Sequence, residues 1–161
     1  MQFSPRLEEK LSKLEGRYPV RRSALIPMLL FAQDEYGLLS KEIIAEVATR
    51  IGLSVLEVEG TISYYSMLRK KPTGRFHVQV CTNISCLLRG GEELYHHAQK
   101  TLGVGNLETT PDGKFSLEEV ECIGACSWAP AIQVNYDFHH EVTPEGLDKL
   151  IQELGKRARE N

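Results

Sequence analysis

The arrangement of four cysteines constrains the fold of this chain more than any other feature of its sequence. Cys81 and Cys86 form a C-x4-C pair, and Cys122 and Cys126 form a C-x3-C pair. Each pair follows a segment whose apolar pattern predicts a β-strand. If these strands are parallel, as a strand–helix–strand crossover implies, their carboxyl ends lie at the same edge of the sheet. The topology can then bring four thiolates to one point, at the edge where open α/β sheets usually bind ligands.

The second half of the chain mixes predicted strands and helices. The alternation from Phe76 to Val80 predicts the first strand, and Gly103 ends the helix that follows it. We expect the last two strands to form a hairpin that turns at Asp137-Phe138. In chain order the predicted elements are a strand at Arg75–Val80, a helix at Glu92–Leu102, a strand at Phe115–Glu121, hairpin strands at Ala131–Tyr136 and His139–Val142, and a helix that begins after Thr143.

The first half of the chain predicts four short helices. The segment Ala24–Ala32 is apolar on nearly every side, so we expect it to be buried in its own domain or against a partner. The fold class is therefore α+β, with an N-terminal helical bundle at residues 1–70 and a second domain at residues 75–161. The predicted helices run from Ser4 to about Glu15, from Ser23 to Tyr36, from Ser40 to Ile51, and from Ser54 through Met67 and Leu68.

The composition excludes several classes of function. The chain has 161 residues, and its net charge of −3 argues against binding to nucleic acid, which needs a basic surface. No stretch approaches the roughly 20 apolar residues that span a bilayer, and the N-terminus lacks a signal pattern. We therefore expect the protein in the cytoplasm. Because thiols stay reduced there, the cysteines favour a metal site over disulfides.

The spacing of the cysteines alone leaves two kinds of metal centre open. Four thiolates suit either a tetrahedral zinc ion or an iron–sulfur cluster, and both accept these spacings. A thioredoxin-type catalyst is disfavoured because neither pair is C-x-x-C. Gly90, Gly91 and Gly124 allow backbone N–H groups to approach sulfur closely. No Walker loop or dinucleotide fingerprint is present in the sequence, so we expect the chain to bind neither NADH nor flavin itself.

Two stretches around the cysteines, Cys81–Gly90 and Val120–Pro130, closely resemble the small [2Fe–2S] subunit of respiratory NADH dehydrogenase (complex I). The resemblance covers nearly the whole chain. One departure is Ser127-Trp128, where the family often has smaller or amide residues, and it leaves the role of Trp128 open. The weaker matches outside the cysteine motifs are Arg22–Pro27 with Ala32-Gln33, Gly60–Ser66 and Glu141–Glu145.

The resemblance implies a thioredoxin-like ferredoxin domain that follows a helical N-terminal domain. It further implies one [2Fe–2S] cluster whose four ligands match Cys81, Cys86, Cys122 and Cys126 one for one. The implied function is electron transfer within NADH-quinone oxidoreductase. Single electrons would pass between the cluster and the flavin (FMN) of an NADH-oxidising partner subunit, beside the other peripheral-arm subunits on the cytoplasmic face of the inner membrane.

Related subunits occur in NAD-linked hydrogenases and formate dehydrogenases. No catalysis is expected from the isolated chain, and a zinc-stabilised interaction module is the alternative from another class.

Overall fold

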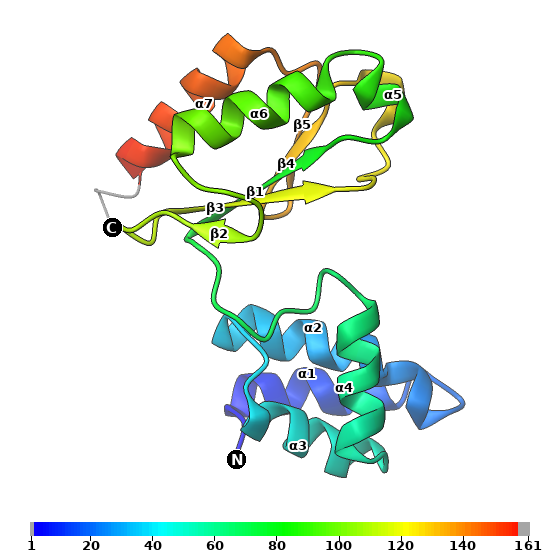
Figure 1. Ribbon diagram of the computed structural model, residues 1–161. Coiled ribbons are helices and arrows are strands. Elements are labelled where there is room, and N and C mark those ends of the chain that lie inside the picture. Colours follow the sequence, from blue (N-terminus) through cyan, green and yellow to red (C-terminus); the bar gives the residue numbers. More distant parts are fainter. Residues whose placement is uncertain (1, 158–161) are drawn as a thin grey trace. The chain divides into compact units, whose positions relative to one another are not determined.

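The computed structural model describes residues 2–157 of the chain. It divides into two compact units, Met1–Pro72 and Thr73–Asn161, each with its own hydrophobic core (Figure 1). Residues 158–161, which the predicted second domain includes, lie outside the described part.

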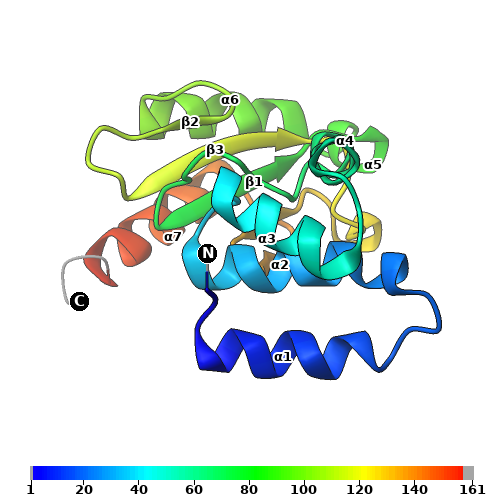
Figure 2. The same cartoon turned by 90° about the horizontal axis from the view of Figure 1, so that it is seen from below.

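Helices make up the first unit. Each of the first, third and fourth begins at a serine whose hydroxyl accepts a backbone N–H, and Ser54 and Glu57 complete a capping box. Their apolar faces share one core, in which α1 and α2 lie side by side (Figure 2). The helices are α1 (Pro5–Glu15), α2 (Leu25–Tyr36), α3 (Lys41–Ile51) and α4 (Val55–Tyr64), with a 3-10 turn at Arg21–Ala24 before α2.

The prediction that the fourth helix continues to Leu68 is wrong. Helix α4 ends at Tyr64, and Tyr65 has extended backbone angles (φ −95°, ψ 105°). The buried side chain of Gln33 explains this end: its amide donates to the carbonyl of Met67 (2.9 Å), and its oxygen accepts the N–H of Arg69 (2.6 Å). These bonds hold the turn after α4 against α2, because a helical segment would use the same backbone groups internally.

The second unit is a five-stranded sheet with helices. The strand order is β2-β3-β1-β4-β5, and the predicted parallel pairing of the two strands before the cysteine pairs is confirmed, because β1 and β3 are parallel. Helices α6 and α7 pack on the sheet face that carries Val78, Val80 and Leu117. The elements are β1 (Phe76–Cys81), α5 (Ile84–Leu87), α6 (Gly91–Leu102), β2 (Glu108–Thr109), β3 (Phe115–Val120), a 3-10 turn η2 (Cys126–Trp128), β4 (Ile132–Val134), β5 (Asp137–His139) and α7 (Pro144–Arg157).

The predicted hairpin turn lies two residues too late. The chain turns at Asn135-Tyr136, between β4 and β5, and Asn135 has a left-handed backbone (φ 55°). Asparagine tolerates this conformation better than most residues. Its amide also donates to the carbonyl of Arg75 (3.2 Å) and accepts the N–H of His77 (3.0 Å). Such side-chain bonding between distant residues has no periodic signal in the sequence. The two-residue β2 and the four-residue α5 are likewise too short to produce a periodic pattern in the sequence.

Between residues 2 and 157, no helix is both long enough and apolar enough to cross a membrane.

Candidate iron–sulfur site

The two cysteine pairs lie at one edge of the sheet. Strand β1 ends at Cys81, which is in register with Val120 at the end of the parallel strand β3. Cys86 lies on the short helix α5, and Cys126 begins the turn η2, which contacts α5. Figure 1 shows α5 beside the loop that follows β3. The fold therefore gathers the four predicted ligands into one region, as the parallel topology requires.

The two pairs differ in exposure and in contacts. Cys81 and Cys86 are buried at 3% and 2% exposure, whereas Cys122 and Cys126 are exposed. The thiol of Cys81 donates to the carbonyl of Glu121 (3.7 Å), which links the first pair to the strand end that leads to the second. Across residues 2–157, no three His, Cys, Asp or Glu side chains converge closely enough to hold a single metal ion.

The electrostatics also connect the pairs. Burial raises the pKa of the Cys86 thiol to about 11, although a backbone hydrogen bond at Ala131 opposes the shift. The neighbouring sulfurs of Cys81 and Cys126 contribute to the same rise in pKa. At neutral pH the free Cys86 side chain is therefore a neutral thiol. A bound metal must displace its proton, because the thiolate is the ligand.

Two glycines shape the surroundings of the sulfurs. A Cβ atom on Gly91 would lie 2.8 Å from the carbonyl oxygens of Cys81 and Cys86, so only glycine permits this close approach. Gly124 adopts a left-handed backbone (φ 78°), and its N–H donates to Cys122 Sγ at 3.3 Å. Hydrogen bonds to sulfur stabilise the negative charge of a thiolate or a cluster. The donor set, four thiols in two pairs with an N–H directed at one of them, therefore fits an iron–sulfur group.

Exposed apolar side chains lie on or directly after α5 and η2, the elements that carry Cys86 and Cys126. Ile84 and Leu88, on and after α5, are 68% and 79% exposed, and Trp128 of η2 is 53% exposed. Contiguous exposed apolar surface on a globular unit marks an interaction site more often than an isolated exposed residue does.

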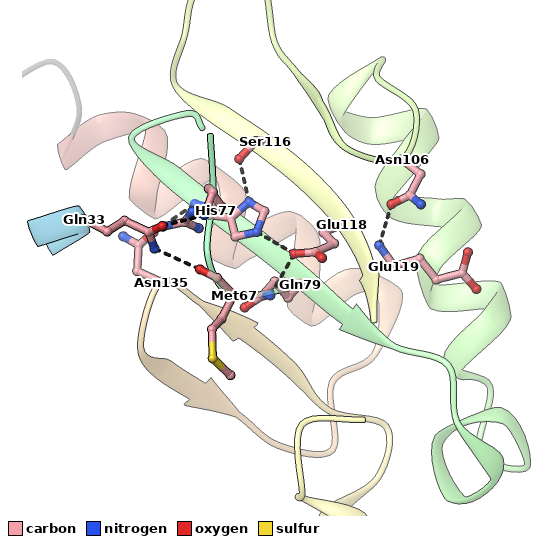
Figure 3. Close-up of polar contacts among 10 residues, drawn as sticks. Gln33, Met67, His77, Gln79, Asn106, Ser116, Glu118, Glu119 and Asn135 are labelled. Carbon is pink, nitrogen blue, oxygen red and sulfur yellow. Dashed lines mark hydrogen bonds and ion pairs between the residues drawn. The ribbon is translucent and has the colours of Figure 1, made fainter. Parts of the chain in front are cut away.

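Sequence reasoning missed a polar network on the sheet face opposite α6 and α7. The His77 ring lies between Ser116 and Glu118, with Nδ1 2.7 Å from Ser116 Oγ and Nε2 2.8 Å from Glu118 Oε2 (Figure 3). The amide of Gln79 also donates to Glu118 Oε2 (2.8 Å). His77, Ser116 and Glu118 are each no more than 8% exposed. The alternation of β1 and β3 places these side chains on one face, but polar residues at those positions usually predict a solvated face.

Replacing Glu118 with alanine is expected to destabilise the chain by about 2–4 kcal/mol, because it leaves the buried His77 ring and the half-buried Gln79 amide without their acceptor. Chemical denaturation of the metal-free chain measures the change. Ser116→Ala removes a single hydrogen bond and should cost about 1 kcal/mol. The matched control is Glu153→Ala on the exposed surface of α7, which should change stability by no more than about 0.5 kcal/mol. Equal stability of the Glu118 variant and this control would contradict the network's role.

The fold and the site define a class of protein: a thioredoxin-like sheet that presents paired thiols at the carboxyl ends of two parallel strands. A family model described as thioredoxin-like [2Fe–2S] ferredoxin matches residues 11–155. The chain belongs to this family, and it is an iron–sulfur protein of electron transport.

Two curated relatives are similar over most of the chain. An E-type subunit of the NADH-quinone oxidoreductase of Rhizobium meliloti is 42% identical over 146 residues, which cover 91% of this chain and 87% of that protein. The corresponding NADH-quinone oxidoreductase subunit of Mycobacterium bovis is 41% identical over 149 residues, which cover 92% of this chain but only 59% of that protein. This chain therefore spans about three fifths of the length of the mycobacterial relative.

A solved structure shows the same fold. The crystal structure of an NAD+-reducing [NiFe]-hydrogenase in the air-oxidized state superimposes with a TM-score of 0.73 at 21% identity, over 83% of this chain and 23% of that chain. This likeness concerns the fold alone.

Proposed function

We propose that the chain is the electron-transfer subunit of an NADH-quinone oxidoreductase and carries one [2Fe–2S] cluster on Cys81, Cys86, Cys122 and Cys126. The cluster exchanges single electrons with the flavin of a partner subunit that oxidises NADH. The observation that carries the proposal is the register of β1 and β3, which sets Cys81 opposite Val120 and so delivers both cysteine pairs to one sheet edge. The relatives named as subunits of NADH-quinone oxidoreductase support the assembly.

The pairing of the ligands favours a two-iron cluster over a single ion. A two-iron cluster takes one pair of thiolates on each iron, and this chain offers one buried pair and one exposed pair. A zinc ion would need all four sulfurs around one point. The zinc-stabilised interaction module remains the second candidate, because four cysteine thiolates are also suitable ligands for zinc. Colour separates the two, since zinc is d¹⁰ and colourless.

The residues around the sulfurs have separate tasks. When bound, the cluster takes up and releases one electron at a time. Burial of Cys81 and Cys86 excludes water from one side of the group, and the Gly124 N–H offsets negative charge at Cys122. Cys122 and Cys126 remain exposed, so electrons enter and leave through this side.

The exposed apolar residues beside the second pair support a docked partner. Ile84, Leu88 and Trp128 are exposed on or directly after α5 and η2, two elements that contact each other, and a flavin-bearing subunit docked there would shorten the electron's path and cover apolar surface. The partner would hold the chain at the cytoplasmic face of the membrane through the rest of the complex.

Reconstitution with the partner tests the proposal. The isolated full chain, loaded with its cluster, should oxidise no NADH, because hydride transfer moves two electrons while the cluster accepts one. Adding the purified flavin subunit should let NADH reduce the cluster, measured as bleaching of its visible absorption. A chain reduced chemically by dithionite serves as the control for full bleaching. Rapid NADH oxidation by flavin-free chain alone would show that it is an enzyme in its own right.

A further inference from the structure

The loop that carries the second cysteine pair has little internal support. We define the ligand loop as residues Cys122–Pro130. Its backbone N–H bonds to groups within the loop run from Gly124 to the sulfur of Cys122 (3.3 Å) and from Trp128 to the carbonyl of Ala125 (3.0 Å). The turn η2 that begins at Cys126 has no buried residue. The buried Ala125 and Ala129 anchor part of the loop beside the first cysteine pair, and contacts from another segment add to this support.

The segment after β5 supplies that support through the backbone. The N–H of Glu141 donates to the carbonyl of Trp128 (2.9 Å), and the N–H of Val142 donates to the carbonyl of Pro130 (2.9 Å). Glu141 has a left-handed backbone (φ 49°), which is strained for a residue with a Cβ. Such strain persists only where the surroundings over-determine it, and the Glu141 side chain is exposed. We therefore attribute this strained conformation of Glu141 to the two backbone hydrogen bonds with the ligand loop.

A side chain of the same segment also contacts the ligand loop. The rings of His140 and Trp128 stack with centroids 5.0 Å apart and an interplanar angle of 22°, and Phe138 lies 6.3 Å from the same His140 ring. Offset stacking of this kind is favourable beyond the area that it buries. Trp128 lies two residues after the ligand Cys126, so a ring held on His140 restrains the end of η2.

We infer that His140, with the backbone of Glu141–Val142, is a clamp that positions the ligand loop and thereby holds the exposed half of the cluster. This inference rests on the proposed function, since it takes Cys122 and Cys126 as ligands. His140 is a positioning residue: it touches Trp128, and it acts on the sulfurs through the loop. In this arrangement Trp128 packs the ligand loop against the segment that follows the β4–β5 hairpin.

The rate of iron loss from the full chain tests the clamp. Removing the ring in His140→Ala should speed the loss of iron to a chelator, under anaerobic conditions, roughly 2- to 10-fold. His140→Phe keeps an aromatic ring for stacking and should restore the wild-type rate. His139→Ala is the matched control, because this neighbouring histidine of β5 has no stacking contact with Trp128 among the described residues. The thermal midpoint of the metal-free chain should be the same in all three variants, which separates local positioning from global stability.

A second readout needs no cluster. Trp128 is the only tryptophan in the sequence, so the fluorescence of the metal-free chain reports on the stack directly. Acrylamide should quench Trp128 more strongly in His140→Ala than in wild type or His140→Phe. Unchanged quenching in His140→Ala, or iron loss at the wild-type rate, would overturn the clamp. A wild-type chain that takes up no iron would refute the proposed function instead, and the quenching result would still decide whether the clamp exists.

Discussion

Replacing Cys122 with alanine in the full chain should remove most of the bound iron while leaving the fold nearly unchanged. Anaerobically prepared wild type is expected to hold about two irons and two sulfides, and the variant at least roughly fivefold less, because a [2Fe–2S] cluster needs all four ligands. Cys122 is exposed, so the stability of the metal-free chain should change by less than about 0.5 kcal/mol. Iron and sulfide analysis, together with denaturation of the metal-free chain, measure both effects.

The buried cysteines should behave differently in the second measurement. Cys86→Ala should lose iron to the same extent as Cys122→Ala, but it should also lower the stability of the metal-free chain, by roughly 1 kcal/mol, because it leaves a small void beside Ala131 and Cys81. Ser127→Ala, an exposed neighbour of Cys126, is the control that should keep both iron and stability. Full iron content in any of the four single cysteine variants, or stoichiometric zinc in wild type expressed with ample iron, would refute the ligand assignment.

Sequence patterns predict the parts of this fold that are regular and local. Serine caps, glycine stops and apolar stripes mark the starts of α1 and α3 and the ends of α2 and α6 correctly. The parallel pairing of β1 and β3 also follows from the sequence, since a helix lies between the two strands and a crossover of this kind makes neighbours parallel. That one inference places both cysteine pairs at the same sheet edge, although it leaves the choice of metal open.

The missing features all depend on contacts between residues far apart in the chain. The end of α4 depends on Gln33, more than thirty residues away, and the hairpin turn depends on the Asn135 amide reaching Arg75 and His77. His77, Ser116 and Glu118 look like residues of a solvated sheet face until the register of β1 and β3 brings them together. Likewise, the stack of Trp128 on His140 joins two loops whose proximity no periodicity reveals.

Gly91 offers the sharpest test of how the first cysteine pair is held. It is the first residue of α6, and its Cα lies against the carbonyl group of Cys86 and the carbonyl oxygen of Cys81. A methyl group there would approach these backbone atoms to 2.8 Å, and backbone atoms cannot rotate away as a flexible side chain can. Gly91→Ala should therefore destabilise the metal-free chain by about 1–3 kcal/mol, in the range of other overpacked sites. It should also push the strand end at Cys81 away from α5, so the chain should bind far less iron.

Gly155→Ala is the matched control, since it makes the same chemical change within a helix. Gly155 lies inside α7, and a Cβ at this position meets no atom within 4 Å. Alanine is the better helix former, so this variant should gain about 0.5–1 kcal/mol and keep its iron. The two substitutions should thus shift the denaturation midpoint in opposite directions. If Gly91→Ala matched Gly155→Ala in both stability and iron content, the close approach of α6 to Cys81 and Cys86 would not be what holds the buried pair in place.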